Sequence, residues 1–134
     1  MIVNDFIGIP FVDKGRDIKG CDCYGLIKLY YKEILNIDIP DVLASPNQPK
    51  LAYMEYLANT NKYWSTSQEM KENSIVAMCT DAEHPKMITH YGIIIKVDNK
   101  LKMLHTFKNV QSHLVDLPNL AYDNKIKAYH EWLS

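Results

Sequence analysis

The spacing of apolar residues changes halfway along the chain, and this change is the feature that most constrains the fold. Between Asp22 and Asn36 apolar residues recur every three or four positions, which is typical of an amphipathic helix with Asp22 as its N-cap. After a proline-containing loop over 37–49, a second helix is predicted over about 49–61. The side chains expected to face mostly inward on it are Leu51, Met54, Tyr56 and Leu57.

The second half of the sequence alternates instead between short strand-like runs and polar breaks. These runs, rich in β-branched and aromatic residues, cover 74–79, 91–97, 101–107, 113–117 and 126–132. Asp98-Asn99 is a hairpin-turn signal, and residues 2–20 are predicted to form a short helical turn followed by a loop. Helices followed by a strand meander predict an α+β fold, with N-terminal helices packed on an antiparallel sheet.

Length and charge restrict the classes of protein further. The 134 residues predict one domain over 1–134, and 47% hydrophobic against 23% charged residues is typical of a globular chain. A net charge of −1 excludes a general attraction to nucleic acid or anionic lipid. The apolar runs are too short to span a membrane, and residues 1–16 lack the pattern of a signal peptide. We therefore expect neither nucleic acid nor membrane as a partner.

Cys23 is the first candidate for chemistry, because it falls in the first turn of the predicted helix. Free backbone N–H groups and the helix dipole there favour a thiolate, the reactive form of cysteine, and can also bind an oxyanion. The alternative is a buried structural cysteine. An odd number of cysteines gives no disulfide framework, so Cys21 is expected to be a small residue beside the site and Cys79 a core thiol.

Two histidines are placed to serve such a nucleophile. If Asp98-Asn99 form a two-residue turn, Val97 pairs with Lys100, and His90 and His105 then point to the same face of the sheet. This geometry suits His90 as general base and His105 as the group that fixes its tautomer, although two structural histidines would show the same spacing. The histidines expected at the surface are His84, His113 and His130.

A zinc site is the competing interpretation of the same side chains. Two cysteines and two histidines can bind zinc, and Cys21, Cys23, His90 and His105 supply that set. The Cys-x-Cys spacing across a helix start directs the two thiols apart, and the chain has no Cys-x₂-Cys pair. We therefore predict no metal and no cofactor.

Three motifs in a fixed order carry a resemblance to a known family. They are Asp-Cys-x-Gly-Leu at 22–26, His-x-Gly-Ile at 90–93 and Leu-His-Thr at 104–106. Further segments that share the resemblance are 7–11, 15–17, 37–41, 72–76 and 126–130. In this combination the chain resembles the NlpC family of cell-wall cysteine peptidases, and more closely its bacteriophage-tail branch.

The resemblance implies a papain-like α+β fold with Cys23 as nucleophile, His90 as base and His105 as orienting residue. It implies hydrolysis of peptidoglycan stem peptides without a cofactor. It also implies other phage tail proteins as partners, and a location in the virion tail or in the host cytoplasm during assembly. The alternatives are a structural or assembly subunit of a tail whose hydrolase site is weak or silent, or a related thiol hydrolase or acyltransferase acting on another amide or ester.

Four residues around the nucleophile are expected to contact the substrate: Phe11, Arg16, Asp22 and Tyr24. Phe11 stands where many family members have a tyrosine, and Tyr24 stands where a serine commonly follows the cysteine. Arg16 is expected to hold a substrate carboxylate with two parallel hydrogen bonds. The alternative for Arg16 is an ordinary solvated loop.

Overall fold

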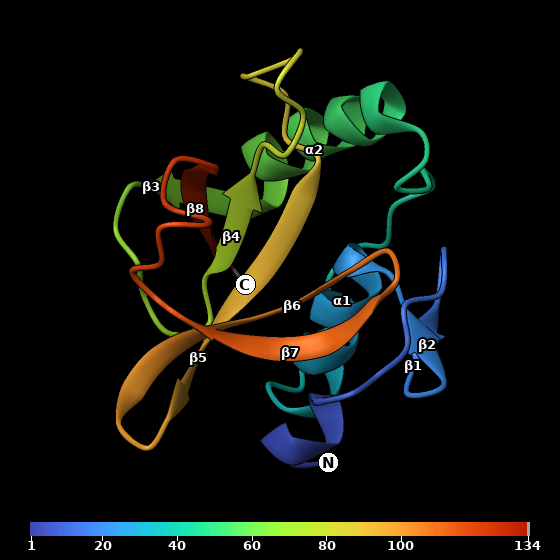
Figure 1. Ribbon diagram of the computed structural model, residues 1–134. Coiled ribbons are helices and arrows are strands. Elements are labelled where there is room, and N and C mark those ends of the chain that lie inside the picture. The colour runs from blue at the N-terminus through green and yellow to red at the C-terminus, as the bar shows by residue number, and fades with distance from the viewer. Residues whose placement is uncertain (134) are drawn as a thin grey trace.

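The computed structural model describes residues 1–133 and has the predicted α+β architecture (Figure 1). A 3-10 helix at Val3–Phe6 opens the chain. The other elements of the first half are β1 (Arg16–Asp17), β2 (Gly20–Cys21), α1 (Cys23–Glu33) and α2 (Pro49–Tyr63). The second half consists of strands: β3 (Trp64–Ser67), β4 (Ile75–Met78), β5 (His90–Val97), β6 (Lys100–Phe107), β7 (Val110–Asp116) and β8 (Ile126–Trp132).

The six strands β3 to β8 form one antiparallel sheet in the order β3-β8-β4-β5-β6-β7. Strands β4 to β7 follow one another as the predicted meander, and β8 returns along the sheet to pair with β4. All five predicted strand runs are confirmed. The sequence pattern missed β3 and the small β1–β2 hairpin, because both are short and polar and carry little alternation.

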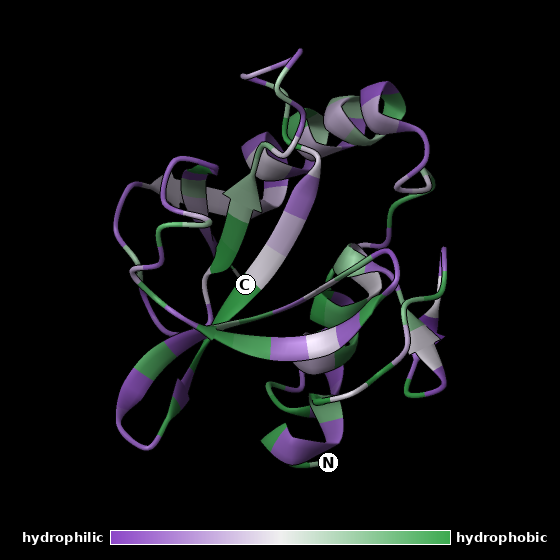
Figure 2. Ribbon diagram, in the orientation of Figure 1, coloured by the Kyte–Doolittle hydropathy of each residue, from purple (hydrophilic) through white to green (hydrophobic). Residues whose placement is uncertain are grey.

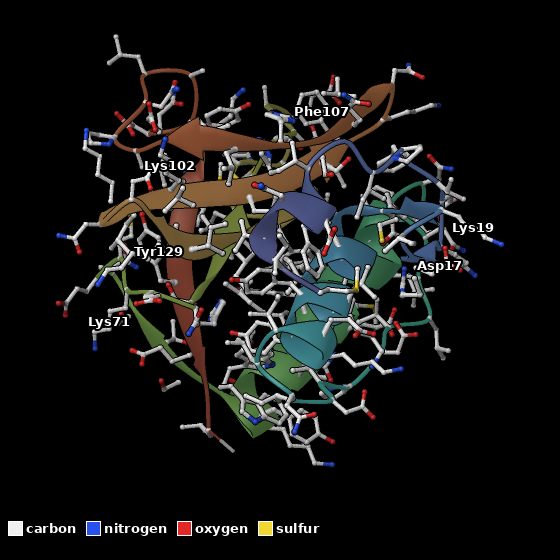
Figure 3. The ribbon with its side chains drawn as sticks, turned by 90° about the horizontal axis from the view of Figure 1, so that it is seen from below. Asp17, Lys19, Lys71, Lys102, Phe107 and Tyr129 are labelled. Atoms are coloured by element: carbon white, nitrogen blue, oxygen red, sulfur yellow. The ribbon has the colours of Figure 1, made fainter. Side chains whose placement is uncertain are left out.

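α1 packs on one face of the sheet against β5 and β6, as the views in Figures 1 and 3 show from two sides. Its buried face includes Leu26, Ile27 and Tyr31, which join Ile93 and Leu104 of the sheet in the main core. Figure 2 shows stretches of hydrophobic colour on α1 among paler and hydrophilic ones, as expected for a helix with one buried face. A second cluster is formed by Val76, Met78, Ile94 and Met103. The three- and four-residue spacing of α1 is thus explained by burial.

α2 corrects one sequence-based prediction. Its expected inward residues Leu51, Met54 and Leu57 are 43%, 66% and 44% exposed, and only Tyr56 is half-buried. The helix turns Tyr56 toward the sheet instead, where its ring centroid lies 6.0 Å from that of Tyr91 in β5 and 5.3 Å from that of His130 in β8. The main core is covered by α1, so spacing alone did not determine which face of α2 is buried.

The β5–β6 hairpin confirms the predicted register. Asp98 and Asn99 have φ values of 50° and 67°, as the two central residues of a type I′ turn require. Val97 consequently pairs with Lys100, and Ile93 with Leu104. A two-residue turn therefore sets which side chains of β5 and β6 share a face.

Candidate active site

Cys23 lies at the N-terminus of α1 and lines a cavity of about 920 Å³. Asp22 is the N-cap, and its Oδ1 accepts a hydrogen bond from the backbone N–H of Gly25 at 2.8 Å. The side chain of Cys23 is nearly buried, with 7% of the residue exposed. The local sequence thus starts the helix at the cysteine, as predicted, and directs the thiol to the cavity wall.

Asp22 is the centre of a buried charged network behind the nucleophile. Besides Gly25, its carboxylate accepts the backbone N–H of Lys14 at 2.9 Å and Nη1 of Arg16 at 2.8 Å. The Nε of Arg16 donates in turn to Asp41 at 2.9 Å. Two loop segments, one at 14–16 and one at Asp41, are therefore tied to the start of α1 by one arginine and one aspartate.

This network gives Arg16 a different place from the predicted one. Its guanidinium is engaged by Asp22 and Asp41, and it does not line the cavity that contains Cys23. Asp22 likewise does not line the main cavity, and its carboxylate accepts from Lys14, Arg16 and Gly25. Both residues therefore help to fix the start of α1, next to Cys23.

Gly25 is required by close packing at the same point. A Cβ on this residue would lie 2.0 Å from the backbone oxygen of Gly15 and 2.8 Å from Nη1 of Arg16. The loop before the helix therefore passes directly over the first turn of α1. Only glycine leaves room for it.

His90 and His105 lie side by side on β5 and β6, as the register predicted. Nε2 of His90 is 2.9 Å from Nδ1 of His105, so one of these nitrogens donates to the other. Both residues are buried and both line the cavity with Cys23. The structure thus brings the three predicted catalytic residues to one cavity.

Burial keeps the two imidazoles neutral. Desolvation is the main cause that lowers the pKa of His90, and desolvation followed by the charge of His90 lowers the pKa of His105. A neutral His90 has a free lone pair, which a general base needs. Its Nδ1 is the ring nitrogen that His105 does not engage.

His105 is surrounded by aromatic rings. The ring centroids of Phe107, His113 and Tyr122 lie 5.5, 4.6 and 5.1 Å from that of His105. Its Nε2 is buried, and within residues 1–133 it has no hydrogen-bond partner. If His90 donates from Nε2, His105 must carry its own proton on Nε2, directed among these rings, whose faces accept N–H groups weakly.

The electrostatics of Cys23 correct the expectation of a resting thiolate. Burial first, and the charge of Asp22 second, raise the pKa of Cys23 to about 12. Backbone N–H groups of Tyr91 and Tyr24 and the charge of Arg16 act in the opposite direction but do not offset burial. Cys23 and His90 therefore rest as a neutral thiol and a neutral imidazole.

The two aromatic residues expected at the site are placed differently from each other. Phe11 lines the main cavity beside Cys23, whereas Tyr24 does not. The hydroxyl of Tyr24 donates to the backbone oxygen of Pro40, and its ring contacts that of Tyr91 edge-on. Tyr24 thus fills the space behind the site and leaves the main cavity open.

The structure also revises the remaining histidines and cysteines. His130 is buried rather than exposed and bonds to Tyr56 and Thr66, and His113 is half-buried against His105. His84 is exposed and Cys79 is buried, as predicted. Within residues 1–133 no three His, Cys, Asp or Glu side chains are grouped so that they could hold a metal ion.

Several cavity residues were not found from the sequence. They come from four loops and the β6–β7 turn: Asp13, Asn47, Thr80, Thr89, Lys108, Tyr122 and Lys125. None belongs to a motif or an apolar repeat, so only the folded chain identifies them.

In the described part of the chain, no helix has the length and apolar character needed to cross a membrane.

Comparison with known proteins supports the fold. No protein-family model and no curated protein matches the sequence. A solved structure is similar, that of a Staphylococcus aureus subsp. aureus Mu50 protein described as similar to a lipoprotein of the NLP/P60 family. The TM-score is 0.60 at 16% sequence identity, over 94% of this chain and 37% of that one. The fold is therefore compatible with an NlpC/P60-like fold, two helices with a large antiparallel sheet.

Proposed function

We propose that the protein is a cysteine hydrolase that cleaves amide bonds in peptidoglycan stem peptides. The observation that carries the proposal is the convergence of Cys23, His90 and His105 on one cavity, with the two imidazoles in hydrogen-bond contact. The similar NLP/P60 fold supports the cell-wall substrate class. The resemblance of the three sequence motifs supports the same chemistry.

The neutral resting state determines how such a reaction starts. His90 Nδ1 takes the thiol proton as Sγ of Cys23 attacks the carbonyl carbon, so thiolate forms only during attack. The backbone N–H of Cys23, at the start of α1, is the group proposed to stabilise the oxyanion, because the N–H of Gly25 is already bound by Asp22. His90 then returns the proton to the leaving amine, which leaves a thioester on Cys23.

The second half of the reaction repeats the proton transfer. A water molecule gives a proton to His90 and its oxygen attacks the thioester carbon. The carbon–sulfur bond breaks, His90 returns the proton to Sγ, and the product leaves as a carboxylic acid that loses its remaining proton to solvent. Throughout, His105 holds the imidazole of His90 in one orientation through the 2.9 Å contact.

The proposal is tested with purified stem peptides and mass spectrometry. Wild-type protein is expected to split an amide bond of the peptide, and Cys23→Ala is expected to split none. Cys21→Ala is the matched control, because Cys21 is also buried but lies outside the cavity with its Sγ directed at the backbone oxygen of Asp17. Equal loss of cleavage in both variants would contradict a nucleophilic role for Cys23.

A phage tail is the proposed setting, with other tail proteins as partners, and the resemblance to the tail branch of the NlpC family is its support. A tail subunit with a weak or silent site is the second candidate. The observation that favours it is the nearly buried Cys23 with its raised pKa. Detection of the chain in purified virions tests the setting, and the peptide assay on the same particles separates the two candidates.

A further inference from the structure

Two lysines line the cavity from segments that are far apart in the sequence. Lys108 belongs to the turn between β6 and β7, and Lys125 to the loop just before β8. Among the described residues that line this cavity, the only other acidic or basic side chain besides the two lysines and the two neutral histidines is that of Asp13. The site therefore contains more positive than negative charge, although the chain as a whole carries −1.

Neither lysine has a carboxylate partner within residues 1–133, whereas Arg16 is held by two. The backbone of Lys125 is fixed: its N–H donates to Tyr122 and its C=O accepts from Cys79, both at 2.8 Å. Its Nζ lies 6.0 Å from the centre of the Tyr122 ring, itself a cavity residue. The positive charge also reaches the base, because Lys125 contributes to lowering the pKa of His90.

Asp13, which also lines the cavity, differs from the two lysines because its charged group already has hydrogen-bond partners. Both of its carboxylate oxygens accept from Oγ of Ser45 at 2.8 Å, and Oδ2 also accepts from Asn47 at 3.2 Å. Its negative charge is thus already bound by neutral donors of the loop before α2. The charges of the two lysines remain for a ligand.

We propose that Lys108 and Lys125 form a carboxylate-binding subsite, so that the cavity selects peptides with free carboxylates. This inference rests on the proposed function and names the residues that bind the substrate's carboxylate. Lys108 and Lys125, which belong to none of the three sequence motifs, take the role that the sequence suggested for Arg16. An ammonium group binds a carboxylate as a point charge, so the subsite accepts a terminal or a side-chain carboxylate that reaches it.

The test measures binding separately from cleavage. The Cys23→Ala protein is titrated by calorimetry with a stem tripeptide that has free carboxylates and with the same peptide fully amidated. Two further peptides, amidated only at the terminal or only at the side-chain carboxylates, distinguish the two sources. Lys125→Met and Lys108→Met are compared with Lys127→Met, a matched control outside the cavity whose Nζ donates to the backbone of Asn124.

We expect the free peptide to bind roughly tenfold more tightly than the amidated one, and each cavity variant to lose about fivefold to tenfold for the free peptide alone. Lys127→Met should bind like the parent, and added salt should reduce the difference. Equal affinity for both peptides, equal losses in all three lysine variants, or no binding of either peptide would overturn the subsite. Charge-dependent binding without cleavage by the protein with Cys23 intact would instead overturn only the proposed hydrolysis.

Discussion

The two sides of the candidate site are held in place by different forces. On the cysteine side, the start of α1 is fixed by a buried carboxylate, Asp22, that binds one arginine and two backbone N–H groups. On the histidine side, His90 and His105 are placed by strand register and kept neutral by burial. Charged contacts thus position Cys23, whereas backbone pairing positions two neutral histidines.

Single substitutions are therefore expected to act differently on the two sides of the site. Strand register depends on many backbone hydrogen bonds, so single side chains of β5 and β6 can be changed without moving their neighbours. The cysteine side depends on a few charged contacts between loops, so one substitution there disturbs several segments. Substitutions at the cysteine side should therefore affect stability more than substitutions at the histidine side.

Removing the base should have the largest effect on turnover and little on stability. His90→Ala is expected to lower kcat by about 10²- to 10⁴-fold, because it removes the imidazole that is proposed to take the proton of the Cys23 thiol and return it to the leaving amine. His105→Asn should cost less than His105→Ala, since an amide oxygen can still orient His90. Peptide cleavage rates, with thermal melting as the control for folding, measure this. Full activity of His105→Ala would remove it from the orienting role.

Breaking the charged network should reduce stability most. Arg16→Met leaves the buried carboxylate of Asp22 without its cation and is expected to lower the free energy of unfolding by about 3 kcal/mol. Asp41→Asn removes only an exposed partner and should cost about 1 kcal/mol or less. Urea unfolding of the two variants compares them. A larger loss for Asp41→Asn would show that Asp41, rather than Asp22, anchors the arginine.

Two glycines, one on each side, extend the comparison. Gly25→Ala puts a methyl group against the backbone oxygen of Gly15 at 2.0 Å, so we expect a loss of about 1–3 kcal/mol. At Gly92 the nearest atoms, at 2.7 Å, belong to the flexible side chain of Met103, which can move. Gly92→Ala should therefore cost less in the same unfolding experiment. Equal losses would indicate that the sheet side is as tightly packed as the helix start.

Acid should act mainly on the histidine side. Burial lowers the pKa of His130 to about 4, and also lowers the pKa of His90 and His105, below the ordinary value of 6.5. Between these values the unfolded chain binds more protons than the folded one, so stability is full above pH 6.5 and falls as pH drops toward 4. His130→Gln should reduce the loss between pH 7 and pH 5 by about 1–2 kcal/mol, measured by urea unfolding. An unchanged pH slope would mean that His130 stays neutral when unfolded or charged when folded.

Local patterns in the sequence predicted the elements that carry the site. The helix starts at Cys23 because Asp22 caps it, and β5 and β6 pair in the expected register because Asp98 and Asn99 adopt positive φ. These features depend on neighbours within a few residues. The predictions that were wrong concern burial: Leu51, Met54 and Leu57 of α2 are exposed, and His130 is enclosed.

The sequence by itself determined the two helices and the five main strand runs, that Cys23 opens a helix, and that His90 and His105 share a face. Only the tertiary structure decided the environment of those groups: the raised pKa of Cys23, the capture of Arg16 by Asp22 and Asp41, and the exposure of Lys108 and Lys125 to the cavity. The physical reason is the separation along the chain of the residues that interact. Capping and turn formation involve residues close in the chain, whereas burial and charge pairing depend on segments that meet only after folding.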